Sequence, residues 1–320
     1  MKNTDFFICV ACLDEGFLYI FKFDGKKIVT LLKREKLKFC QPISNILKKK
    51  YFFVGTRKKE IFFYKKDPKK VIKKISFINI GCIPTYISVS EKKNLVFYAS
   101  YHGNCFGIIS IKKKKLFFVR KMHLSSCHCI IFDEKKKLIW ATSLKEDSVK
   151  IYKLHKNLSI SLHKVVKTSK FFGPRHIIFH PKNKYSYLIG EKNGLVSIID
   201  RNSYKIIDNI ASLPKNFNYF WSSEICITSN AKWIYTAERR HSILSCFIAN
   251  QKGDCIKLLR IQKTTKQPRS FSIEKNGKYL ACVGQESNEL CIYKIDKKYG
   301  KLLNLCQIET GKNPISSIFL

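Results

Sequence analysis

The sequence predicts an all-β fold made of seven repeats, and three observations lead to this prediction. Seven short apolar segments, each ending in a small residue, recur at intervals of 42–49 residues along the 320-residue chain. Each is followed by a second strand of period two, such as Phe17–Phe23, Val149–Leu154 and Glu289–Ile295. No amphipathic helix of useful length interrupts the pattern. Each interval suits four short strands with their turns and leaves no room for helical crossovers between parallel strands.

The small residues that end the apolar segments mark the repeats: Ala11, Gly55, Ala99, Ala141, Gly190, Ala237 and Gly284. A short leading strand precedes six of them: Pro42–Leu47, Thr85–Ser90, His128–Phe132, Arg175–Phe179, Glu224–Thr228 and Arg269–Ile273. The first apolar segment has no leading strand, and the chain ends with a spare one, Pro314–Leu320. We therefore expect the C-terminal strand to pair with the N-terminal blade. The result is a single seven-bladed β-propeller domain over residues 1–320, without a long exposed sheet edge.

Hydrophobicity and cysteine usage favour a soluble intracellular protein. The longest apolar run, Phe6–Leu13, has eight residues, which is too short to span a membrane. Asp5 and Asp14 flank this run, and it matches the repeat, so we interpret it as a strand and not as an export signal. The thirteen cysteines are scattered and do not form a disulfide framework. A reducing compartment, the cytoplasm, is therefore expected.

The net charge of +38, from 61 basic and 23 acidic residues, raises the question of nucleic-acid binding. Only nine of the basic residues are arginine, and lysine runs such as Lys112–Lys115 and Lys135–Lys137 fall at predicted turns. A surface selected for phosphate contacts would cluster its charge and use more arginine. A solvated lysine-rich surface, typical of an AT-rich genome, is the favoured interpretation, and no specific nucleic-acid partner is expected. Binding of nucleic acid to the lysine-rich face remains an alternative.

Strand topology selects candidate functional residues. In an antiparallel blade, the start of the leading strand and the end of the next strand lie at the same edge. The residues at these places include four of the nine arginines, whose planar guanidinium suits bidentate recognition of anions. The residues are Tyr101, His102, His128, Arg175, His176, Glu191, Glu224, Arg239, Arg240, Arg269 and Gln285.

Other chemistries lack support in the sequence. Cys9 and Cys12 lie on opposite faces of a strand, and the neighbouring residues of Cys127–Cys129 alternate in the same way. The motifs of serine hydrolases, nucleotide-binding P-loops and dinucleotide-binding folds are absent from the sequence. No metal ion and no cofactor are therefore expected.

Several short motifs resemble those of a known family. They are GPRHIIFHP (Gly173–Pro181) with a glutamate at Glu191, QPR (Gln267–Arg269), CH at Cys127–His128, and the runs that end at Arg239 and Gln285. On these motifs, from about Phe6 to the C-terminus, the chain resembles the propeller-type lactonases, and more closely the bacterial 6-phosphogluconolactonases among them.

The resemblance implies metal-independent hydrolysis of 6-phospho-D-glucono-1,5-lactone to 6-phospho-D-gluconate, in the oxidative pentose phosphate pathway. It implies His128, Arg175, Glu191 and Arg269 as catalytic residues. It also implies that three further residues bind substrate: His176, Arg239 and Gln285. Either Glu191 or His128 would activate water, and either Arg269 or Arg175 would stabilise the oxyanion.

Two other functions are open on the sequence. One is a non-catalytic propeller that serves as a scaffold for protein partners, and the other is a muconate-type lactonising cycloisomerase. Under the favoured interpretation the partner is a small phosphorylated sugar lactone. Neither a membrane nor a second subunit is expected, so the protein should be a monomer.

Overall fold

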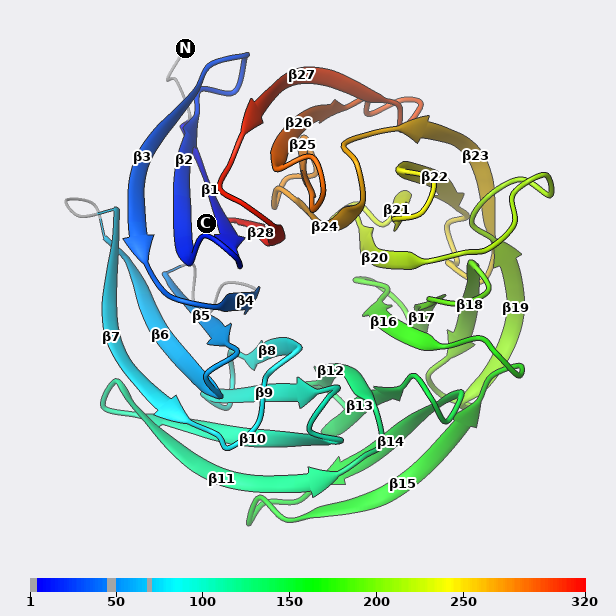
Figure 1. Cartoon of the computed structure of the whole chain (residues 1–320). Coiled ribbons are helices and arrows are strands. Elements are labelled where there is room, and N and C mark those ends of the chain that lie inside the picture. Colours follow the sequence, from blue (N-terminus) through cyan, green and yellow to red (C-terminus); the bar gives the residue numbers. More distant parts are fainter. Residues whose placement is uncertain (1–4, 45–49, 68–70) are drawn as a thin grey trace. The chain divides into compact units, whose positions relative to one another are not determined.

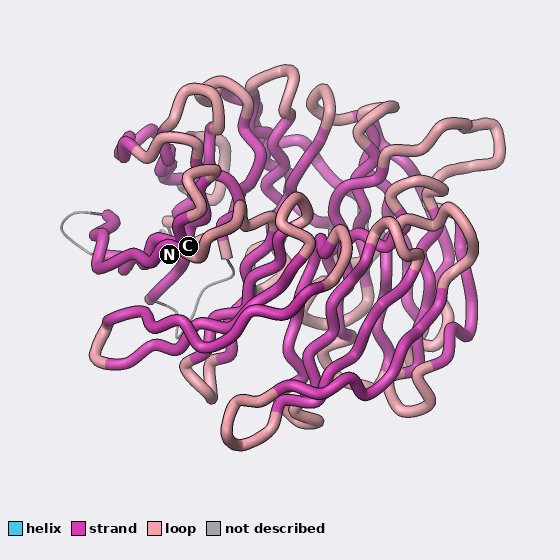
Figure 2. The backbone as a smooth tube through the Cα atoms, turned by 60° about the horizontal axis from the view of Figure 1, so that its bottom comes forward, coloured by secondary structure: helices cyan, strands magenta, loops and turns pink. Residues whose placement is uncertain are grey.

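A computed structural model describes residues 5–44, 50–67 and 71–320. All the regular secondary structure in these ranges consists of β-strands (Figure 2). The described strands form seven four-stranded sheets. The chain divides into two compact units: unit 1 comprises Met1–Lys36 and His176–Phe319, and unit 2 comprises Leu37–Arg175 and Leu320. The all-β class and the seven predicted blades are confirmed.

Unit 2 contains three blades, each with its strands in sequence order across the sheet. Their strands are β4 (Cys40–Ile43), β5 (Tyr51–Thr56), β6 (Glu60–Asp67) and β7 (Val71–Asn79); β8 (Tyr86–Ser90), β9 (Leu95–Ser100), β10 (Cys105–Lys112) and β11 (Lys115–His123); and β12 (Cys127–Asp133), β13 (Leu138–Ser143), β14 (Ser148–Leu154) and β15 (Ile160–Lys167).

Unit 1 contains the other four blades, the first of which begins with β16, two residues before the boundary between the units. Three have their strands in sequence order: β16 (Pro174–Phe179), β17 (Tyr185–Gly190), β18 (Leu195–Asp200) and β19 (Lys205–Ala211); β20 (Ser222–Ile227), β21 (Trp233–Glu238), β22 (Ile243–Ala249) and β23 (Ile256–Lys263); and β24 (Pro268–Ile273), β25 (Tyr279–Gly284), β26 (Glu289–Ile295) and β27 (Leu302–Glu309). The fourth consists of β28 (Pro314–Phe319), β1 (Phe6–Cys12), β2 (Phe17–Phe23) and β3 (Val29–Lys36).

The two ends of the chain share one blade. The C-terminal strand β28 pairs antiparallel with β1, and the register places Ile8 opposite Phe319 and Val10 opposite Ser317 (Figure 1). The C-terminal strand thus supplies the leading strand that the first repeat lacks, as predicted. The pairing satisfies backbone groups of β1 that would otherwise form an open sheet edge.

Burial explains why one strand per repeat is so apolar. Every residue of β9, β13, β21 and β25 is buried, because these second strands lie inside their sheets and are covered on both faces. The outermost strands, such as β3, β11 and β27, mix exposed and half-buried residues. A continuous apolar run therefore marks the inside of a blade, whereas its outer strand lacks a strong sequence signal.

A repeated hydrogen bond connects neighbouring blades of unit 1. In three blades, a buried tyrosine of the second strand donates its hydroxyl to a glycine carbonyl between the third and fourth strands of the next blade. The pairs are Tyr187 to Gly253 (2.8 Å), Tyr235 to Gly300 (2.8 Å) and Tyr279 to Gly25 (2.6 Å). Gly300 has a φ of 66°, and a Cβ there would lie 2.5 Å from the Trp233 ring, so this turn requires glycine.

The leading strands contain a recurrent bulge at their first residues. Pairing of β12 with β13 skips from Cys127 to Ile130, and pairing of β20 with β21 skips from Ser222 to Ile225. The strand β4 likewise skips two residues after Cys40, whereas β24 skips only one, Arg269. A bulge bends the strand and redirects the side chains of its unpaired residues, which makes these positions suitable for a site.

Most predicted leading strands agree with the observed ones to within two residues. The exception is β4, which covers Cys40–Ile43 where Pro42–Leu47 was expected; residues 45–47 lie outside the described residues. Its sequence, CQPI, contains a proline and little apolar alternation, so the pattern did not mark its start.

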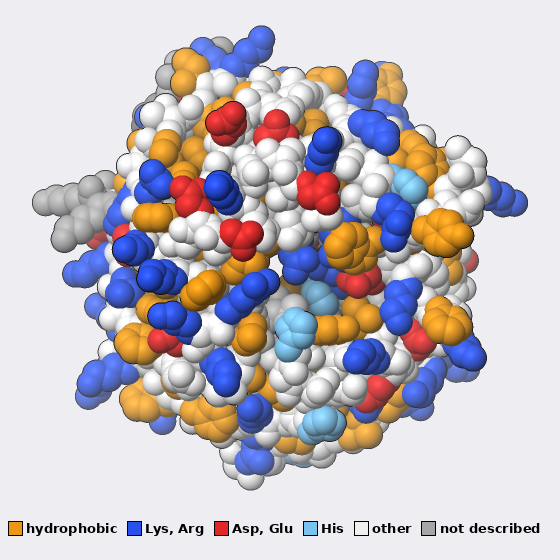
Figure 3. Space-filling view, viewed as in Figure 1, with side chains coloured by type: hydrophobic (Ala, Val, Ile, Leu, Met, Phe, Trp, Pro, Cys, Tyr) orange, Lys and Arg blue, Asp and Glu red, His pale blue; other side chains and the backbone are white. Residues whose placement is uncertain are grey.

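Basic side chains are spread over the visible face, with a smaller number of acidic ones between them (Figure 3). The lysine runs lie at turns as expected: Lys113 and Lys114 connect β10 to β11, and Lys135–Lys137 connect β12 to β13. Within the part of the chain that the structure describes, no helix is long and apolar enough to cross a membrane.

Candidate active site

The start of each leading strand lies beside the end of the strand that follows it. In unit 1 the Arg239 amide donates to the Trp221 carbonyl at 3.1 Å, and the Gln285 amide donates to the Gln267 carbonyl at 2.9 Å. In unit 2 the Leu144 amide donates to the Ser126 carbonyl at 3.2 Å. The topological rule used to select candidate residues is therefore correct within each of these blades.

Bulges position three of the candidates. His128 lies in the bulge of β12, Glu224 in that of β20 and Arg269 in that of β24. His128 and Arg269 occupy corresponding positions, because each follows directly the first paired residue of its leading strand, Cys127 or Pro268. The repeat thus directs a different side chain to the same place in different blades.

Arg239 is the most constrained of the candidates in unit 1. Its side chain is buried, its Nε donates to the Trp221 carbonyl at 3.2 Å, and its terminal nitrogen donates to the Ser222 carbonyl at 3.2 Å. The same nitrogen lies 3.0 Å from Glu191 Oε2. The guanidinium also stacks on the Trp221 ring, 3.8 Å from its centroid.

Glu191 is held between neighbouring blades. It follows β17, its carboxylate pairs with Arg239, and its carbonyl accepts the Ser222 amide at 3.0 Å. A charge-assisted pair of this kind, largely shielded from water, holds the carboxylate in one place. The structure therefore brings together two of the predicted residues: Glu191, predicted to be catalytic, and Arg239, predicted to bind substrate.

His176 and Glu224 form a second pair between the same two blades. His176 Nδ1 lies 2.5 Å from Glu224 Oε1, and both side chains are largely buried. Glu224 also accepts the Ile225 amide at 3.3 Å. A carboxylate on one ring nitrogen fixes the orientation of the imidazole and leaves Nε2 to contact another group. Sequence reasoning named both residues but did not pair them.

Arg269 and Gln285 belong to the adjacent blade of unit 1. Both are half-buried, and Arg269 follows Pro268, whose carbonyl accepts the Ser223 hydroxyl at 2.6 Å. Gln285 Oε1 is buried and has no hydrogen-bond partner among the residues that the structure describes. A buried amide oxygen without a partner is costly, which fits a position that a ligand completes.

His128 and Arg175 belong to unit 2. The His128 ring is buried and lies 6.1 Å from the Tyr101 ring, in an edge-to-face arrangement at 64°. Arg175 is also buried, and its carbonyl accepts the Thr142 hydroxyl at 3.0 Å.

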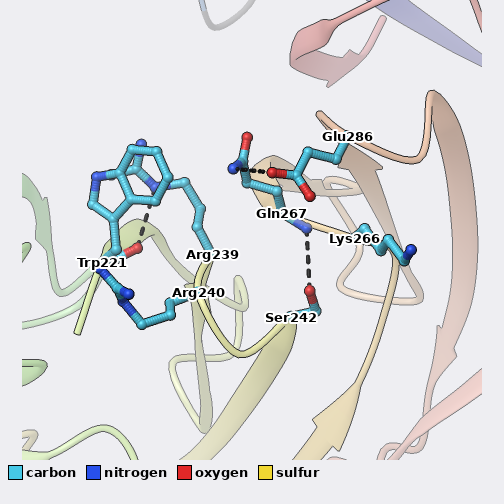
Figure 4. A pocket seen from close by; sticks show the side chains of 7 residues that line it. All are labelled: Trp221, Arg239, Arg240, Ser242, Lys266, Gln267 and Glu286. Atoms are coloured by element: carbon cyan, nitrogen blue, oxygen red, sulfur yellow. Dashed lines mark hydrogen bonds between the residues drawn. The ribbon is translucent and has the colours of Figure 1, made fainter. Parts of the chain in front are cut away.

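A pocket of about 460 Å³ opens beside the Arg239 side chain in unit 1 (Figure 4). Its lining residues are Trp221, Arg239, Arg240, Ser242, Lys266, Gln267 and Glu286. Strand topology selected two of these as candidates, Arg239 and Arg240, and a specific role was predicted only for Arg239. Trp221, Lys266 and Glu286 lie in loops next to the strands, where periodicity gives no signal, although Lys266 and Glu286 flank the candidates Gln267–Arg269 and Gln285.

The cysteines next to the candidates are not suited to nucleophilic catalysis. Burial raises the pKa of the Cys127 thiol well above its usual range, and burial with the nearby Glu224 carboxylate does the same to the pKa of Cys226. Both remain protonated thiols at neutral pH, and a thiol is a poor nucleophile. In the described ranges, no three His, Cys, Asp or Glu side chains are grouped as metal ligands.

Comparison with known proteins gives a consistent result. Residues 8–317 match the family described as "Lactonase, 7-bladed beta-propeller". The chain is 33% identical to the 6-phosphogluconolactonase of Buchnera aphidicola subsp. Schizaphis graminum (strain Sg), over 86% of each sequence. It is 29% identical to the 6-phosphogluconolactonase of Serratia proteamaculans (strain 568), again over 86% of each.

Solved structures show the same fold. The periplasmic gluconolactonase of Pseudomonas aeruginosa superposes with a TM-score of 0.91, 18% identity and 99% coverage of both chains. A protein from Lactobacillus plantarum superposes with a TM-score of 0.89 and 19% identity, over 99% of this chain and 100% of that one. Because the family match covers nearly the whole sequence, the chain belongs to the seven-bladed β-propeller lactonase family.

Proposed function

We propose that the chain is a 6-phosphogluconolactonase, which hydrolyses 6-phospho-D-glucono-1,5-lactone to 6-phospho-D-gluconate in the oxidative pentose phosphate pathway. The observation that carries the proposal is the buried Arg239–Glu191 pair at 3.0 Å beside a pocket rich in cations. A carboxylate and several guanidinium groups are the residue types that lactone opening and recognition of a phosphate require. Curated relatives from several bacteria are named for this activity.

The reaction needs three functions from the protein. A general base removes a proton from water as its oxygen bonds to the lactone carbonyl carbon. Cationic donors stabilise the tetrahedral oxyanion. The bond from that carbon to the ring oxygen then breaks, and the ring oxygen takes a proton to become the hydroxyl of the open acid.

Particular residues are proposed for these functions. The base is Glu191 or His128, and the oxyanion is stabilised by Arg269 or Arg175. Glu191 already has a fixed carboxylate, because Arg239 holds it. A general base must contact the water from which it takes a proton, so the contact with Arg239 would have to loosen when substrate binds if Glu191 is the base.

Substrate binding is proposed for His176, Arg239 and Gln285. The His176–Glu224 contact would orient the imidazole toward a sugar hydroxyl, with Glu224 as a positioning residue. Gln285 has a buried amide oxygen available to accept a hydroxyl proton. Arg239 would act mainly by shaping the site, because its Nε and one terminal nitrogen already contact two carbonyls and Glu191.

We also propose that the protein acts in the cytoplasm as a monomer and without a cofactor. All thirteen cysteines are free thiols, the state that a reducing compartment maintains.

The proposal is tested by following freshly generated 6-phosphogluconolactone by NMR, with and without the purified protein and in the presence of EDTA. Hydrolysis well above the spontaneous rate and unaffected by EDTA is expected. A rate equal to the spontaneous rate, with folded protein, would contradict the lactonase function. A scaffold or a lactonising cycloisomerase would then be the better explanation.

A further inference from the structure

The pocket beside Arg239 combines one paired cation with two that have no ion pair or hydrogen bond among the described residues. Arg239 is neutralised by Glu191 and bonded to two backbone carbonyls. Arg240 and Lys266 are exposed, and across the described residues neither side chain forms an ion pair or a hydrogen bond. Two cationic residues, both unpaired among the described residues, therefore line one pocket, and one of them is an arginine in a chain that has only nine.

The turn that carries Arg240 is fixed by hydrogen bonds to the Glu238 carboxylate. The buried Glu238 carboxylate accepts two backbone amides, that of Trp221 at 2.5 Å and that of His241 at 2.6 Å. These bonds connect Glu238 to His241 across the turn that contains Arg239 and Arg240, and they connect the turn to Trp221. A cation mounted on a fixed turn loses less freedom when it binds an anion than one on a mobile loop.

Neutral donors lie next to the two cations. Gln267 Nε2 donates to Glu286 Oε1 at 2.8 Å, and the Gln267 amide donates to Ser242 Oγ at 3.2 Å (Figure 4). Since Ser242 Oγ accepts that bond, its proton remains available to a ligand. Glu286 is the single acidic residue that lines the pocket, and it orients the Gln267 amide.

The remaining wall is apolar. The Trp221 ring covers the Arg239 guanidinium at 3.8 Å and is itself 37% exposed. A pocket with one aromatic wall, two cations and two neutral donors matches a small ligand that carries a phosphate on a carbon skeleton. Its volume of about 460 Å³ is in the usual range for small-molecule sites.

We propose that this pocket binds the phosphate group of a sugar phosphate, with Arg240 and Lys266 as the charged ligands and Ser242 and Gln267 as neutral donors. The inference rests on the proposed lactonase function and deepens it, because it assigns the group that separates the phosphorylated lactone from the plain one. Arg269 and Gln285, each within two residues of the pocket lining, would contact the lactone end.

The test compares two substrates, 6-phosphogluconolactone and D-glucono-1,5-lactone, in the wild-type protein and in variants. The quantity measured is the preference, which is kcat/KM for the first substrate divided by kcat/KM for the second. Arg240→Gln and Lys266→Gln should each lower the preference about tenfold, since a charge-assisted hydrogen bond to phosphate is lost. Glu286→Gln should raise the preference severalfold, because it removes a negative charge from the pocket.

The matched control is Lys257→Gln, which removes one exposed lysine from β23, outside the pocket lining. It should leave both kcat/KM values unchanged. Thermal unfolding of each variant checks that the fold is intact. Preferences that stay at the wild-type value in both Arg240→Gln and Lys266→Gln would overturn the phosphate site, while the lactonase function would stand.

Binding of the stable product, 6-phospho-D-gluconate, separates the two proposals. Titration calorimetry should show about tenfold weaker binding to each of Arg240→Gln and Lys266→Gln than to wild type. If wild type hydrolyses neither lactone, the lactonase proposal fails, and the calorimetry alone decides the site. No binding of 6-phospho-D-gluconate to wild type would overturn the phosphate site whatever the kinetics show.

Discussion

Residue by residue, Glu191 has two roles to separate: it pairs with Arg239 between two blades, and it is a proposed general base. Glu191→Gln separates them, because glutamine keeps the size of the side chain and an oxygen that can accept from Arg239. We expect kcat for 6-phosphogluconolactone to fall by about 10²–10⁴ if Glu191 is the base. The measurement is the steady-state rate over a range of pH.

The control for this prediction is Glu309→Gln, which removes one exposed carboxylate from β27. It should leave kcat unchanged. A wild-type kcat in Glu191→Gln would exclude Glu191 as the base, and the same experiment would then be made with His128→Gln.

His180 gives a prediction about pH and stability. It follows β16, and its Nδ1 accepts the amides of Lys182 and Asn183, both at 3.2 Å. Burial, followed by the charges of Arg201 and Lys182, holds the pKa of His180 below its ordinary value of 6.5. The unfolded chain therefore takes up a proton at a higher pH than the folded chain, so stability is lost as the pH falls below about 6.5.

The chain itself supplies the matched variant. Asp133 ends the corresponding strand of another blade, and its Oδ1 accepts the amides of Lys135 and Lys136 at 3.0 Å. His180→Asp should therefore keep the turn and weaken the loss of unfolding free energy between pH 7 and pH 5. Urea denaturation at several pH values measures this, and equal pH dependence in both proteins would contradict it.

The pocket shows what sequence reasoning could not find at this scale. Arg239 was predicted because it directly follows a recognisable strand, β21. Trp221 lies in the approach to β20 and stacks on Arg239 at 3.8 Å, yet it belongs to no periodic segment. The His176–Glu224 pair was within reach, because both residues start leading strands in neighbouring blades, but no local pattern says that the two side chains meet.

Among the elements, the leading and second strands were predictable, because the same apolar pattern recurs in every repeat and each copy supports the strand boundaries predicted in the others. Outer strands such as β3 (VTLLKREK) were not assigned individually, since their half-exposed residues resemble those of a loop. The hydrogen bonds between blades were also not predicted. They depend on which glycine carbonyl of the next blade lies within hydrogen-bond distance of a given tyrosine hydroxyl.

Tyr235→Phe tests one of these contacts between blades. The Tyr235 hydroxyl is buried and donates to the Gly300 carbonyl at 2.8 Å. Its removal leaves that carbonyl only the weak Cys246 thiol donor, at 3.3 Å, so the free energy of unfolding should fall by about 1 kcal/mol. Tyr98→Phe is the matched control, because the buried Tyr98 hydroxyl has no hydrogen-bond partner among the described residues.

The control should be neutral or stabilising, since it removes a buried hydroxyl for which the described part of the chain offers no partner. Chemical denaturation of the two variants and of wild type gives the comparison. Equal losses of stability in Tyr235→Phe and Tyr98→Phe would show that the hydrogen bond to Gly300 does not contribute.

For the whole molecule, the division into two units raises the question of whether they unfold together. Unit 1 contains the first strand, β1, and the last strand, β28, which pair with each other, so neither unit is a simple N- or C-terminal half. We propose that residues 1–320 form one domain. One cooperative unfolding transition is then expected, whichever unit carries the probe.

The three tryptophans make this prediction testable. Trp140 lies in unit 2, whereas Trp221 and Trp233 lie in unit 1. Trp140→Phe leaves tryptophan fluorescence only from unit 1. The double variant Trp221→Phe with Trp233→Phe leaves tryptophan fluorescence only from unit 2. Each reporter is compared with far-ultraviolet circular dichroism of the same variant, because the substitutions also change stability.

A single domain requires that fluorescence and circular dichroism give the same midpoint and slope in urea for each variant. Two separable domains would instead give a circular dichroism curve with two steps. The tryptophan fluorescence of each variant would then follow only the step in which its own unit unfolds. Joint unfolding would also explain why the closing strand matters for the whole chain. Loss of the β28–β1 pairing opens an edge in unit 1, and if the units unfold together, that single event destabilises all seven blades.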